Sequence, residues 1–427
     1  MKHHYYLILA FVLLGCENNF EDIHRYSKVI SESKEYSVYL DMSEIGNIHV
    51  TARLPQVQPF KIVSNDKYYF VGDMLKGIHV YEKKGGNASY LCFIECKYIK
   101  DFELVNNLLF CNNFVDLVVI DVTTPLQINI LHREKNHFNR FTSYKDYWNV
   151  PFVEGKGLIV GKEMHVLTGT VTDKNPNLDF KEYDSLYGNL MTKELPDSWF
   201  TNHPEYDKPY IGIIKVDPDQ IYTYGTYNSW AICSFISGTF NVREENSWST
   251  PRGEYGPPYY FGDSFPVRMF YTDSLIYILG KAMSSGYSDC ITYTETYPLT
   301  YHLFFPTFTP LDITYLPNFR EFIVLSGQSV WGGFKYPGNT SVYMEKYIDY
   351  KIPTSASTIF STGNNVIILG NELSVYLASE NDLKFLKTYP DISGTCYLKK
   401  GNVLAVANAQ GLFLYDINDL ENIILIP

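Results

Sequence analysis

Four segments of the chain share one pattern, in which three short strands are separated by polar turns. They span residues 62–82, 102–121, 360–378 and 397–416. The third predicted strand begins at Gly77 and Asp116 in the first two segments, 39 residues apart (116 − 77), and at Leu373 and Gly411 in the last two, 38 apart (411 − 373). A period of about 40 residues, built from short strands and Asn or Gly turns, predicts one four-stranded β-propeller blade per repeat.

Weaker copies of the pattern bring the number of candidate units to eight; they lie at residues 153–170, 211–235, 266–293 and 313–344. The composition favours sheet, because aromatic residues make up 16% and charged residues only 19% of the 427 residues. We therefore predict an all-β fold, a β-propeller of four-stranded blades, with seven blades favoured and six or eight as alternatives. A solenoid is the alternative architecture, but it needs capping repeats, and neither end of the chain has the pattern of a helical cap.

The third strands also carry a recurring motif. It reads KGIHVYE at residues 76–82, VDLVVIDVTTP at residues 115–125 and GLFLYDINDLENI at residues 411–423. This motif resembles the LVIVD repeat of bacterial lipoproteins with β-propeller bodies, over about residues 60–135 and 355–427. Thr124 and Ala378 depart from the repeat, which usually has acidic residues at these positions. The resemblance implies a surface or envelope protein and offers no catalytic residues to carry over.

The acids of the repeat have a structural interpretation. Asp121 and Asp416 each end a predicted strand and precede a turn. Since Asp side chains accept hydrogen bonds from backbone N–H groups two residues on, we expect both to stabilise turns rather than act as general acids.

The amino terminus has the pattern of a lipoprotein signal. Met1-Lys2 precedes an apolar run over residues 5–14, which is too short to span a bilayer as a helix. Leu13-Leu14-Gly15-Cys16 resembles the bacterial lipobox, and the resemblance implies cleavage before Cys16 and lipid attachment to it. The alternative is a simple secretion signal with an incidental cysteine. We predict a signal peptide over 1–15, a lipid-anchored tether over 16–26 and a single propeller domain over 27–427.

Charge and hydropathy limit the location and the partners. The formal net charge is −12, and loss of Lys2 with the signal would make it −13 (34 − 47), so nucleic acid is not an expected partner. No later run approaches the roughly 18 apolar residues of a transmembrane helix. The acidic stretch at residues 17–22 resembles a surface-export signal. We expect attachment to the outer membrane of a cell envelope, with the surface or periplasmic side left open.

Six further cysteines follow Cys16: Cys92, Cys96, Cys111, Cys233, Cys290 and Cys396. An oxidising compartment allows disulfides. Cys92 and Cys96 lie four residues apart on a predicted strand, which separates them by roughly 13 Å, too far for a disulfide with each other. Either can instead meet Cys111 on a neighbouring strand. The interpretation that we favour over disulfides is that the six are free cysteines that act as small buried apolar groups.

The longest predicted insertion, around residues 167–210, contains a candidate calcium loop. Oxygen-bearing side chains alternate along it and recur at the position of a last ligand: Asp173, Asn175, Asn177, Asp179 and Asp184. This spacing resembles the start of an EF-hand loop. However, Leu178 replaces the glycine that the sharp turn needs, and Pro176 stiffens the middle. We therefore favour the alternative, an irregular polar loop, over a metal site, and we predict no cofactor.

A second candidate site is the aromatic loop around residues 246–262. Its Pro and Gly residues disfavour regular structure, yet it concentrates aromatic side chains: Trp248, Tyr255, Tyr259, Tyr260 and Phe261. Exposed aromatics on a stiff loop suit stacking against a sugar ring or a partner's side chain. The alternative is that they cover a small core of their own.

No nucleophile elbow, phosphate loop, dinucleotide fingerprint or zinc-binding helix motif occurs in the sequence. We therefore favour a non-catalytic binding or scaffold protein of the envelope, with a protein or glycan partner. The alternatives are a purely structural lipoprotein of an envelope complex and an envelope enzyme acting on glycans with carboxylates in the central channel. Two or more acids facing the channel from inner strands would point to the enzyme.

Overall fold

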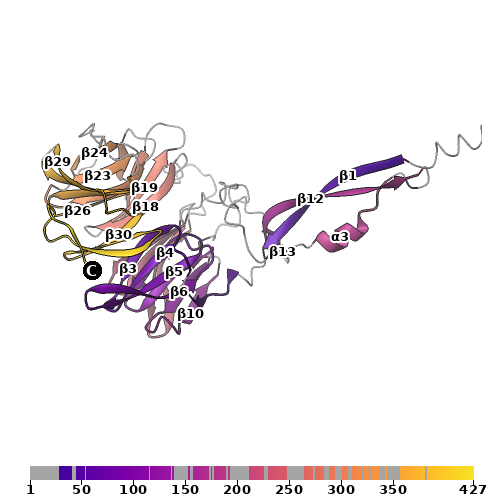
Figure 1. Ribbon diagram of the computed structural model, residues 1–427, viewed down its shortest axis with the longest axis horizontal. Coiled ribbons are helices and arrows are strands. Elements are labelled where there is room, and N and C mark those ends of the chain that lie inside the picture. The colour runs from indigo at the N-terminus through magenta and orange to yellow at the C-terminus, as the bar shows by residue number, and fades with distance from the viewer. Residues whose placement is uncertain are drawn as a thin grey trace, which may run out of the picture. The chain divides into compact units, whose positions relative to one another are not determined.

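The computed structural model defines a fold made almost entirely of strands. It describes residues 28–40, 45–52, 54–114, 116–135, 137–138, 152–153, 157–172, 175, 177–188, 191–192, 211–225, 229–247, 264–272, 275–282, 288–293, 301–305, 310–319, 321–326, 329–335, 342–343, 356–379 and 382–427. The chain divides into two compact units, one of residues 1–44 and 146–206 and one of residues 45–145 and 207–427 (Figure 1).

The described residues of the larger unit form seven sheets, which we number blade 1 to blade 7 in chain order. Blade 1 contains β2 (His49–Thr51), β3 (Pro59–Ser64), β4 (Tyr68–Asp73), β5 (Gly77–Lys84) and β6 (Asn87–Glu95); blade 2 contains β7 (Phe102–Val105), β8 (Leu108–Asn113), β9 (Asp116–Asp121) and β10 (Asn129–Glu134). Blade 3 contains β14 (Ile211–Asp217), β15 (Gln220–Gly225), β16 (Ser229–Ile236) and β17 (Thr239–Ser247); blade 4 contains β18 (Ser264–Thr272), β19 (Leu275–Ala282), β20 (Ser288–Tyr293), β21 (Tyr301–Phe305) and β25 (Val342–Tyr343). Blade 5 contains β22 (Pro310–Leu316), β23 (Glu321–Ser326) and β24 (Ser329–Lys335); blade 6 contains β26 (Thr358–Thr362), β27 (Asn365–Leu369), β28 (Leu373–Ser379) and β29 (Asp382–Tyr389). Blade 7 contains β30 (Cys396–Lys400), β31 (Val403–Asn408), β32 (Gly411–Asp416) and β33 (Ile424–Leu425).

The blades are antiparallel meanders arranged in a ring, so the larger unit is a β-propeller, as predicted. Consecutive strands are neighbours in these sheets, with two exceptions: β2 pairs with β6 at the edge of blade 1, and β25 pairs in parallel with β21 at the edge of blade 4. In blade 1 the first strand of the meander is β3, since β2 lies at the opposite edge of the sheet; β3 contacts both β7 of blade 2 and β30 of blade 7, which closes the ring. The number of blades in the whole chain stays a prediction.

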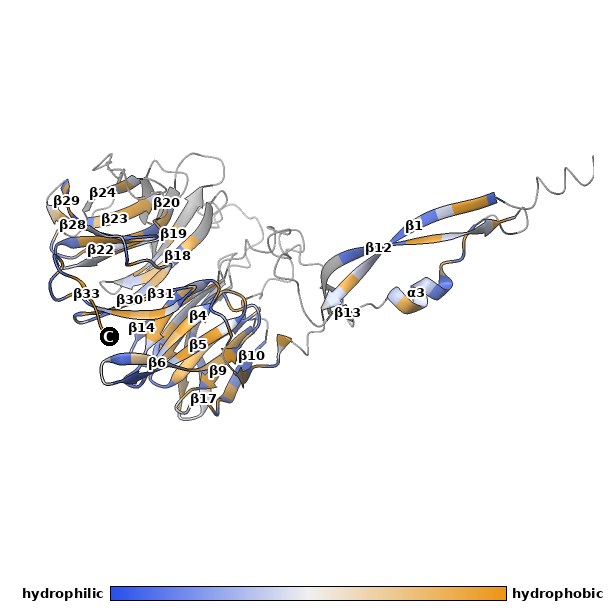
Figure 2. Ribbon diagram, viewed as in Figure 1, coloured by the Kyte–Doolittle hydropathy of each residue, from blue (hydrophilic) through white to orange (hydrophobic). Residues whose placement is uncertain are grey.

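Alternation along each strand builds the core between blades. On β4, Phe70 packs into the cluster shared with blade 2, whereas its neighbours Tyr69 and Val71 pack into the cluster shared with blade 7. On β31, Leu404 faces blade 6 and Ala405 faces blade 1. Since successive side chains point to opposite faces of a sheet, a nearly continuous apolar strand is buried on both sides. Figure 2 shows the resulting hydrophobic colour along these strands.

The local sequence signals of the blades are confirmed. The strands β5, β9, β28 and β32 begin at the four predicted residues Gly77, Asp116, Leu373 and Gly411. Asp121 Oδ1 accepts hydrogen bonds from the backbone N–H and the hydroxyl of Thr123, and Asp416 Oδ1 accepts one from the N–H of Asn418. Both acids therefore stabilise the turn that follows their strand.

Blade 7 joins blade 1 without sharing a strand. Gln56, which is 7% exposed, donates from Nε2 to the carbonyls of Asn408 at 2.6 Å and Gly411 at 3.3 Å. Its Oε1 accepts the hydroxyl of Tyr81 at 2.9 Å. Thr395 Oγ1 donates to the Pro59 carbonyl at 2.6 Å. Ring closure therefore depends on side-chain hydrogen bonds and on the shared apolar cluster.

The smaller unit is a long ribbon of β1 (Lys28–Leu40) and β12 (Gly157–Val171), which pair antiparallel. The short strands β11 (Phe152–Val153) and β13 (Met191–Thr192) extend it, and helix α3 (Lys181–Tyr187) contributes Tyr187, whose ring lies 4.0 Å from that of His165 on β12. Residues 153–170, one of the weaker candidate units, therefore belong to this ribbon, whereas the single propeller domain over 27–427 stays a prediction. An alternating pattern predicts a strand but does not identify its partner.

No helix in the described part of the chain is long and apolar enough to cross a membrane.

Candidate functional site in the central channel

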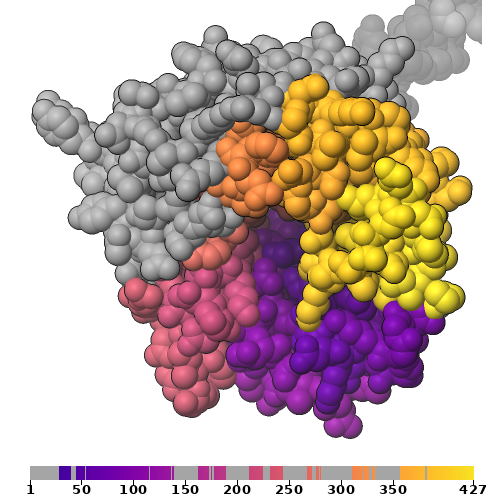
Figure 3. Space-filling view, turned by 90° about the vertical axis from the view of Figure 1, so that its left-hand side faces the viewer, coloured from indigo at the N-terminus to yellow at the C-terminus, as the bar shows by residue number. Residues whose placement is uncertain are grey.

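The first strands of the blades surround the centre of the ring, and they carry charged side chains there. Neighbouring first strands contact one another from β3 through β7, β14, β18 and β22 to β26. The space-filling view shows the larger unit hollowed at its centre (Figure 3). Five charged side chains of these strands, or of the residue just before one, form two clusters in the channel: Lys61, Asp101 and Glu103 in the first, and Arg268 and Asp312 in the second.

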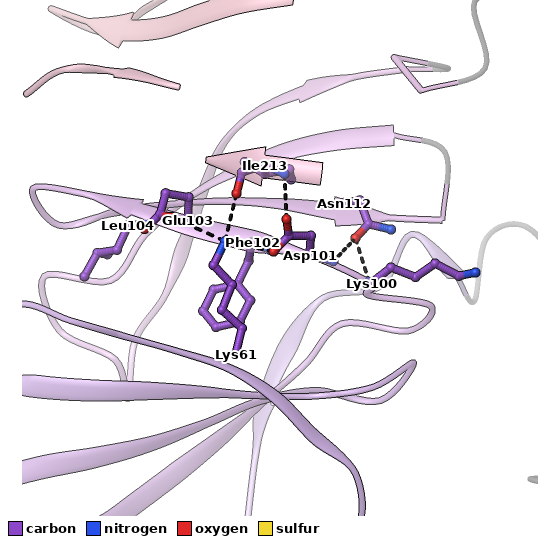
Figure 4. A network of polar contacts seen from close by, with 8 residues as sticks. All are labelled: Lys61, Lys100, Asp101, Phe102, Glu103, Leu104, Asn112 and Ile213. Atoms are coloured by element: carbon purple, nitrogen blue, oxygen red, sulfur yellow. Dashed lines mark hydrogen bonds and ion pairs between the residues drawn. The ribbon is translucent and has the colours of Figure 1, made fainter. Parts of the chain in front are cut away.

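The first cluster connects three successive blades (Figure 4). Lys61 Nζ on β3 lies 2.9 Å from Asp101 Oδ1 and 3.3 Å from Glu103 Oε2, both of blade 2. Asp101 Oδ2 accepts the backbone N–H of Ile213 in blade 3 at 2.6 Å, and Lys61 donates to the Ile213 carbonyl at 2.8 Å. A cation of one blade is thus paired with an acid of the next, and both bind the backbone of the third.

The second cluster repeats this construction. Arg268 Nη1 on β18 lies 2.7 Å from Asp312 Oδ1 on β22. Asp312 Oδ2 accepts the backbone N–H of Ile359 in blade 6 at 2.9 Å and the hydroxyl of Thr358. Blades 4, 5 and 6 are therefore linked as blades 1, 2 and 3 are.

A local sequence signal places three of these side chains. Lys61, Arg268 and Asp312 each stand two residues after a proline near the start of a first strand, at Pro59, Pro266 and Pro310. In all three strands the pairing register shifts between the proline and the charged residue. Because proline has no N–H to donate to the neighbouring strand, the pairing is interrupted there, and the side chains of the next residues change direction. Sequence reasoning missed this signal.

Asn112 fixes the connection that carries Asp101. Its Oδ1 accepts the N–H groups of Lys100 at 2.7 Å and Asp101 at 2.9 Å. Its Nδ2 donates to the carbonyls of Tyr98 and Phe114, each at 3.0 Å. This fully buried amide thereby supplies partners for four backbone groups.

Burial governs the electrostatics of the first cluster. It raises the pKa of Asp101 against the opposing effects of Lys61 and the Ile213 N–H, and Glu103 adds to the rise. Burial alone would lower the pKa of Lys61, but the charges of Asp101 and Glu103 outweigh it, so this pKa is raised. Two carboxylates with one ammonium carry an excess negative charge, which favours retention of protons.

In the second cluster, burial raises the pKa of Asp312 against Arg268, Thr358 and two backbone N–H groups. Arg268 also acts on Tyr397 of β30. Burial raises the pKa of Tyr397 to about 12, and the positive charge of Arg268 opposes this rise. The Arg268 side chain is 35% exposed, whereas that of Asp312 is 1% exposed. Arg268 is thus the more accessible member of this pair.

The arrangement binds blades together and leaves a polar lining in the channel. Asp101 and Asp312 use oxygens for the backbone of the next blade and for a cation of the preceding one. Lys61, Glu103 and Arg268 keep between 16% and 35% of their side chains exposed. Part of each of these three side chains is therefore accessible from the channel. Over the described residues, no group of three or more His, Cys, Asp or Glu side chains is arranged to hold a metal.

The predicted aromatic residues Trp248, Tyr255, Tyr259, Tyr260 and Phe261 lie outside the described residues, as do Cys16 and the tether. The strands that flank the aromatic loop are described: β17 ends at Ser247 and β18 begins at Ser264. The role of the aromatic residues stays a prediction.

Two of the candidate calcium ligands, Asp179 and Asp184, use side-chain oxygens for other contacts. Asp173 lies outside the described residues. Asp184 Oδ1 accepts hydrogen bonds from Lys34 Nζ at 2.6 Å and the Tyr36 hydroxyl at 3.0 Å, which attaches α3 to β1. Asp179 Oδ1 accepts the N–H of Lys181 at 2.9 Å and stabilises the start of α3. Calcium binding by Asp173, Asn175, Asn177, Asp179 and Asp184 stays untested.

No protein-family model matches the chain, and no curated protein matches it. Three of the solved structures to which the chain is similar illustrate its fold. The first is BamB from Moraxella catarrhalis, with 10% identity, a TM-score of 0.43 and coverage of 83% of each chain. The second is a putative 6-phosphogluconolactonase from Bacteroides fragilis, with 10% identity, a TM-score of 0.46 and coverage of 81% of this chain and 86% of that one. The third is a chain of a mitotic checkpoint complex, with 8% identity, a TM-score of 0.46 and coverage of 90% and 93%.

Proposed function

We propose that the protein is a lipid-anchored β-propeller of the bacterial cell envelope, of the LVIVD-repeat type, that binds a protein or glycan partner without catalysis. The lipobox-like residues Leu13 to Cys16 support the anchor and the outer-membrane location. The repeated motif at residues 115–125 and 411–423 supports the family resemblance.

One observation carries the binding role: two long departures from the repeat each join the last strand of one blade to the first strand of the next. In an antiparallel meander, all such connections lie on one face of the ring. Residues 135–210 connect β10 to β14, and residues 248–263 connect β17 to β18. Loops on a rigid scaffold commonly carry binding residues. This face, which we call the insertion face, is the proposed binding face.

The charged channel residues lie toward the same face. Lys61 and Asp312 occur early in β3 and β22, and Asp101 directly precedes β7. The first strands begin at the insertion face, so these groups mark that end of the channel. A partner held by the aromatic loop would therefore meet Lys61, Glu103 and Arg268 at the centre of the ring.

An affinity purification from envelope extract tests this proposal. The bait is the full chain solubilised in detergent, and a variant carries Trp248→Ala, Tyr259→Ala and Tyr260→Ala. A matched control carries Lys84→Ala and Asn87→Ala in the exposed β5–β6 turn, which lies on the opposite face. We expect one stoichiometric partner with the wild type and the control and at least a tenfold loss with the aromatic variant. Equal recovery with all three baits would contradict the insertion face as the binding face.

The channel acids favour one second candidate, the envelope enzyme acting on glycans. Asp101, Glu103 and Asp312 belong to first strands or directly precede one, which is the arrangement that such an enzyme needs. Cleavage of purified envelope glycans by the wild type, abolished in Glu103→Gln, would establish this activity. Absence of cleavage products together with recovery of a partner would leave the binding role.

A further inference from the structure

Three cysteines gather in the apolar cluster between blades 1 and 2: Cys92, Cys96 and Cys111. Cys96 and Cys111 are fully buried, and their sulfur atoms lie 4.0 Å apart. Cys92, 2% exposed, instead directs its Sγ to the Pro125 carbonyl at 3.6 Å. The structure thus distinguishes one close pair from a third buried thiol in the same cluster.

The backbone on both sides of the close pair is held in place. Cys96 directly follows β6, and its N–H donates to the Lys76 carbonyl at 3.1 Å. Cys111 lies within β8 and pairs with Phe102 on β7 and Val118 on β9. Asn113 Nδ2 donates to the carbonyl of Lys97, next to Cys96, at 2.8 Å. The two sulfur atoms are therefore kept near each other by groups other than the thiols.

We propose that Cys96 and Cys111 form an intramolecular disulfide in the exported protein. A disulfide has an S–S distance of about 2.05 Å, so the sulfur atoms must approach by about 2 Å, through rotation about the Cα–Cβ bonds. The oxidant is a disulfide of an oxidase or of oxidised glutathione. One thiolate attacks a sulfur of that disulfide and expels a thiol, and the second thiolate then displaces the other sulfur, so two protons and two electrons leave the cysteines.

The folded environment indicates when this reaction occurs. The hydrogen bond with Cys111, followed by burial, raises the pKa of Cys96 well above its usual range. A thiol kept protonated in a closed core is a poor nucleophile. Oxidation therefore precedes the final packing of blade 2 against blade 1, while the chain is still open to the oxidant.

The cross-link would join residues 15 positions apart and attach the connection that carries Asp101 to the middle of blade 2. Closing a loop of this length restricts the unfolded chain and stabilises the fold. We expect reduction of the disulfide to lower the melting temperature by roughly 5 °C or more.

Peptide mapping of the full chain tests the pairing. Protein purified from cells is denatured, alkylated without reduction, digested and measured by mass spectrometry. We expect one cross-linked peptide pair, containing Cys96 and Cys111, and alkylated Cys92. The pair should persist in Cys92→Ser and disappear in Cys96→Ser. Alkylation of both Cys96 and Cys111 in wild-type protein, both from cells and after refolding with oxidised glutathione, would overturn the proposal.

The oxidising compartment rests on the proposed envelope location, and refolding separates the two. A cross-link that forms during refolding, with free thiols in protein from cells, would contradict the proposed location and support the pairing. A cross-link in protein from cells supports both.

Discussion

The backbone N–H of Ile213 donates to Asp101 Oδ2 at 2.6 Å, while the carbonyl of the same Ile213 accepts Lys61 Nζ at 2.8 Å. A single residue of blade 3 thus receives contacts from blades 1 and 2. Ile359 of blade 6 receives the equivalent contact from Asp312 of blade 5. The propeller is therefore linked at its centre by charged groups in addition to the apolar packing between blades.

Substitution of Asp101 should show how much this linkage contributes. Asp101→Asn removes the charge that pairs with Lys61 and weakens acceptance of the Ile213 N–H in a mostly buried site. We expect the free energy of unfolding to fall by about 2–4 kcal/mol, measured by urea denaturation at neutral pH. Asp66→Asn is the matched control, because Asp66 lies on an exposed turn, 3.8 Å from Lys400. An equal effect of the two substitutions would contradict the linkage.

The position of Asp101 in turn depends on Asn112. Asn112→Asp keeps the size of the side chain but replaces the donor to Tyr98 and Phe114 by an oxygen that faces their carbonyls. We expect a loss of about 2–4 kcal/mol in the free energy of unfolding, because two buried acceptors lose their partner and a charge is buried. Asn107→Asp, in an exposed turn where Oδ1 accepts from Asn65, should change stability by less than about 0.5 kcal/mol. Denaturation curves that coincide for the two variants would show that Asn112 is dispensable.

The sequence predicts best what is determined locally. The starts of β5, β9, β28 and β32 were predicted to the residue, because Asn, Asp and Gly turns limit each strand. The same reasoning placed Asp121 and Asp416 in their turns correctly.

Relationships between distant segments were not predicted. The pattern at residues 153–170 indicated a strand but not its partner. That partner is β1, and the whole of blades 1 and 2 lies between the two strands in the sequence. The channel acids were also missed. Asp101 and its partner Ile213 are 112 residues apart in the sequence, and the repeats do not share a charged residue at the position of Asp101. The local sequence signal for these channel residues is the proline that stands two residues before each of Lys61, Arg268 and Asp312.

The stability contributed by Asp73 should depend on pH. Burial would raise the pKa of Asp73, but hydrogen bonds from His79 and from the N–H groups of Gln58 and Val57 outweigh it, so this pKa is lowered from 3.8. A carboxyl whose pKa is lower in the folded state stabilises the fold above its unfolded pKa and loses this effect as pH falls through its folded pKa. We therefore expect the stability difference between wild type and Asp73→Asn to be full well above pH 3.8 and to shrink below it. Urea denaturation across this range measures it, and a difference that is constant with pH would contradict the assignment.

Ring closure should be sensitive to the amide of Gln56. Gln56→Glu retains the acceptor for the Tyr81 hydroxyl but replaces Nε2, the donor to the Asn408 and Gly411 carbonyls, by an oxygen. Because the side chain is buried, we expect a loss of about 2–4 kcal/mol in the free energy of unfolding, together with faster proteolysis in blades 1 and 7. The same substitution at the exposed Gln58 should cost less than about 0.5 kcal/mol. If Gln56→Glu unfolded at the same urea concentration as Gln58→Glu, ring closure would not depend on the Gln56 amide.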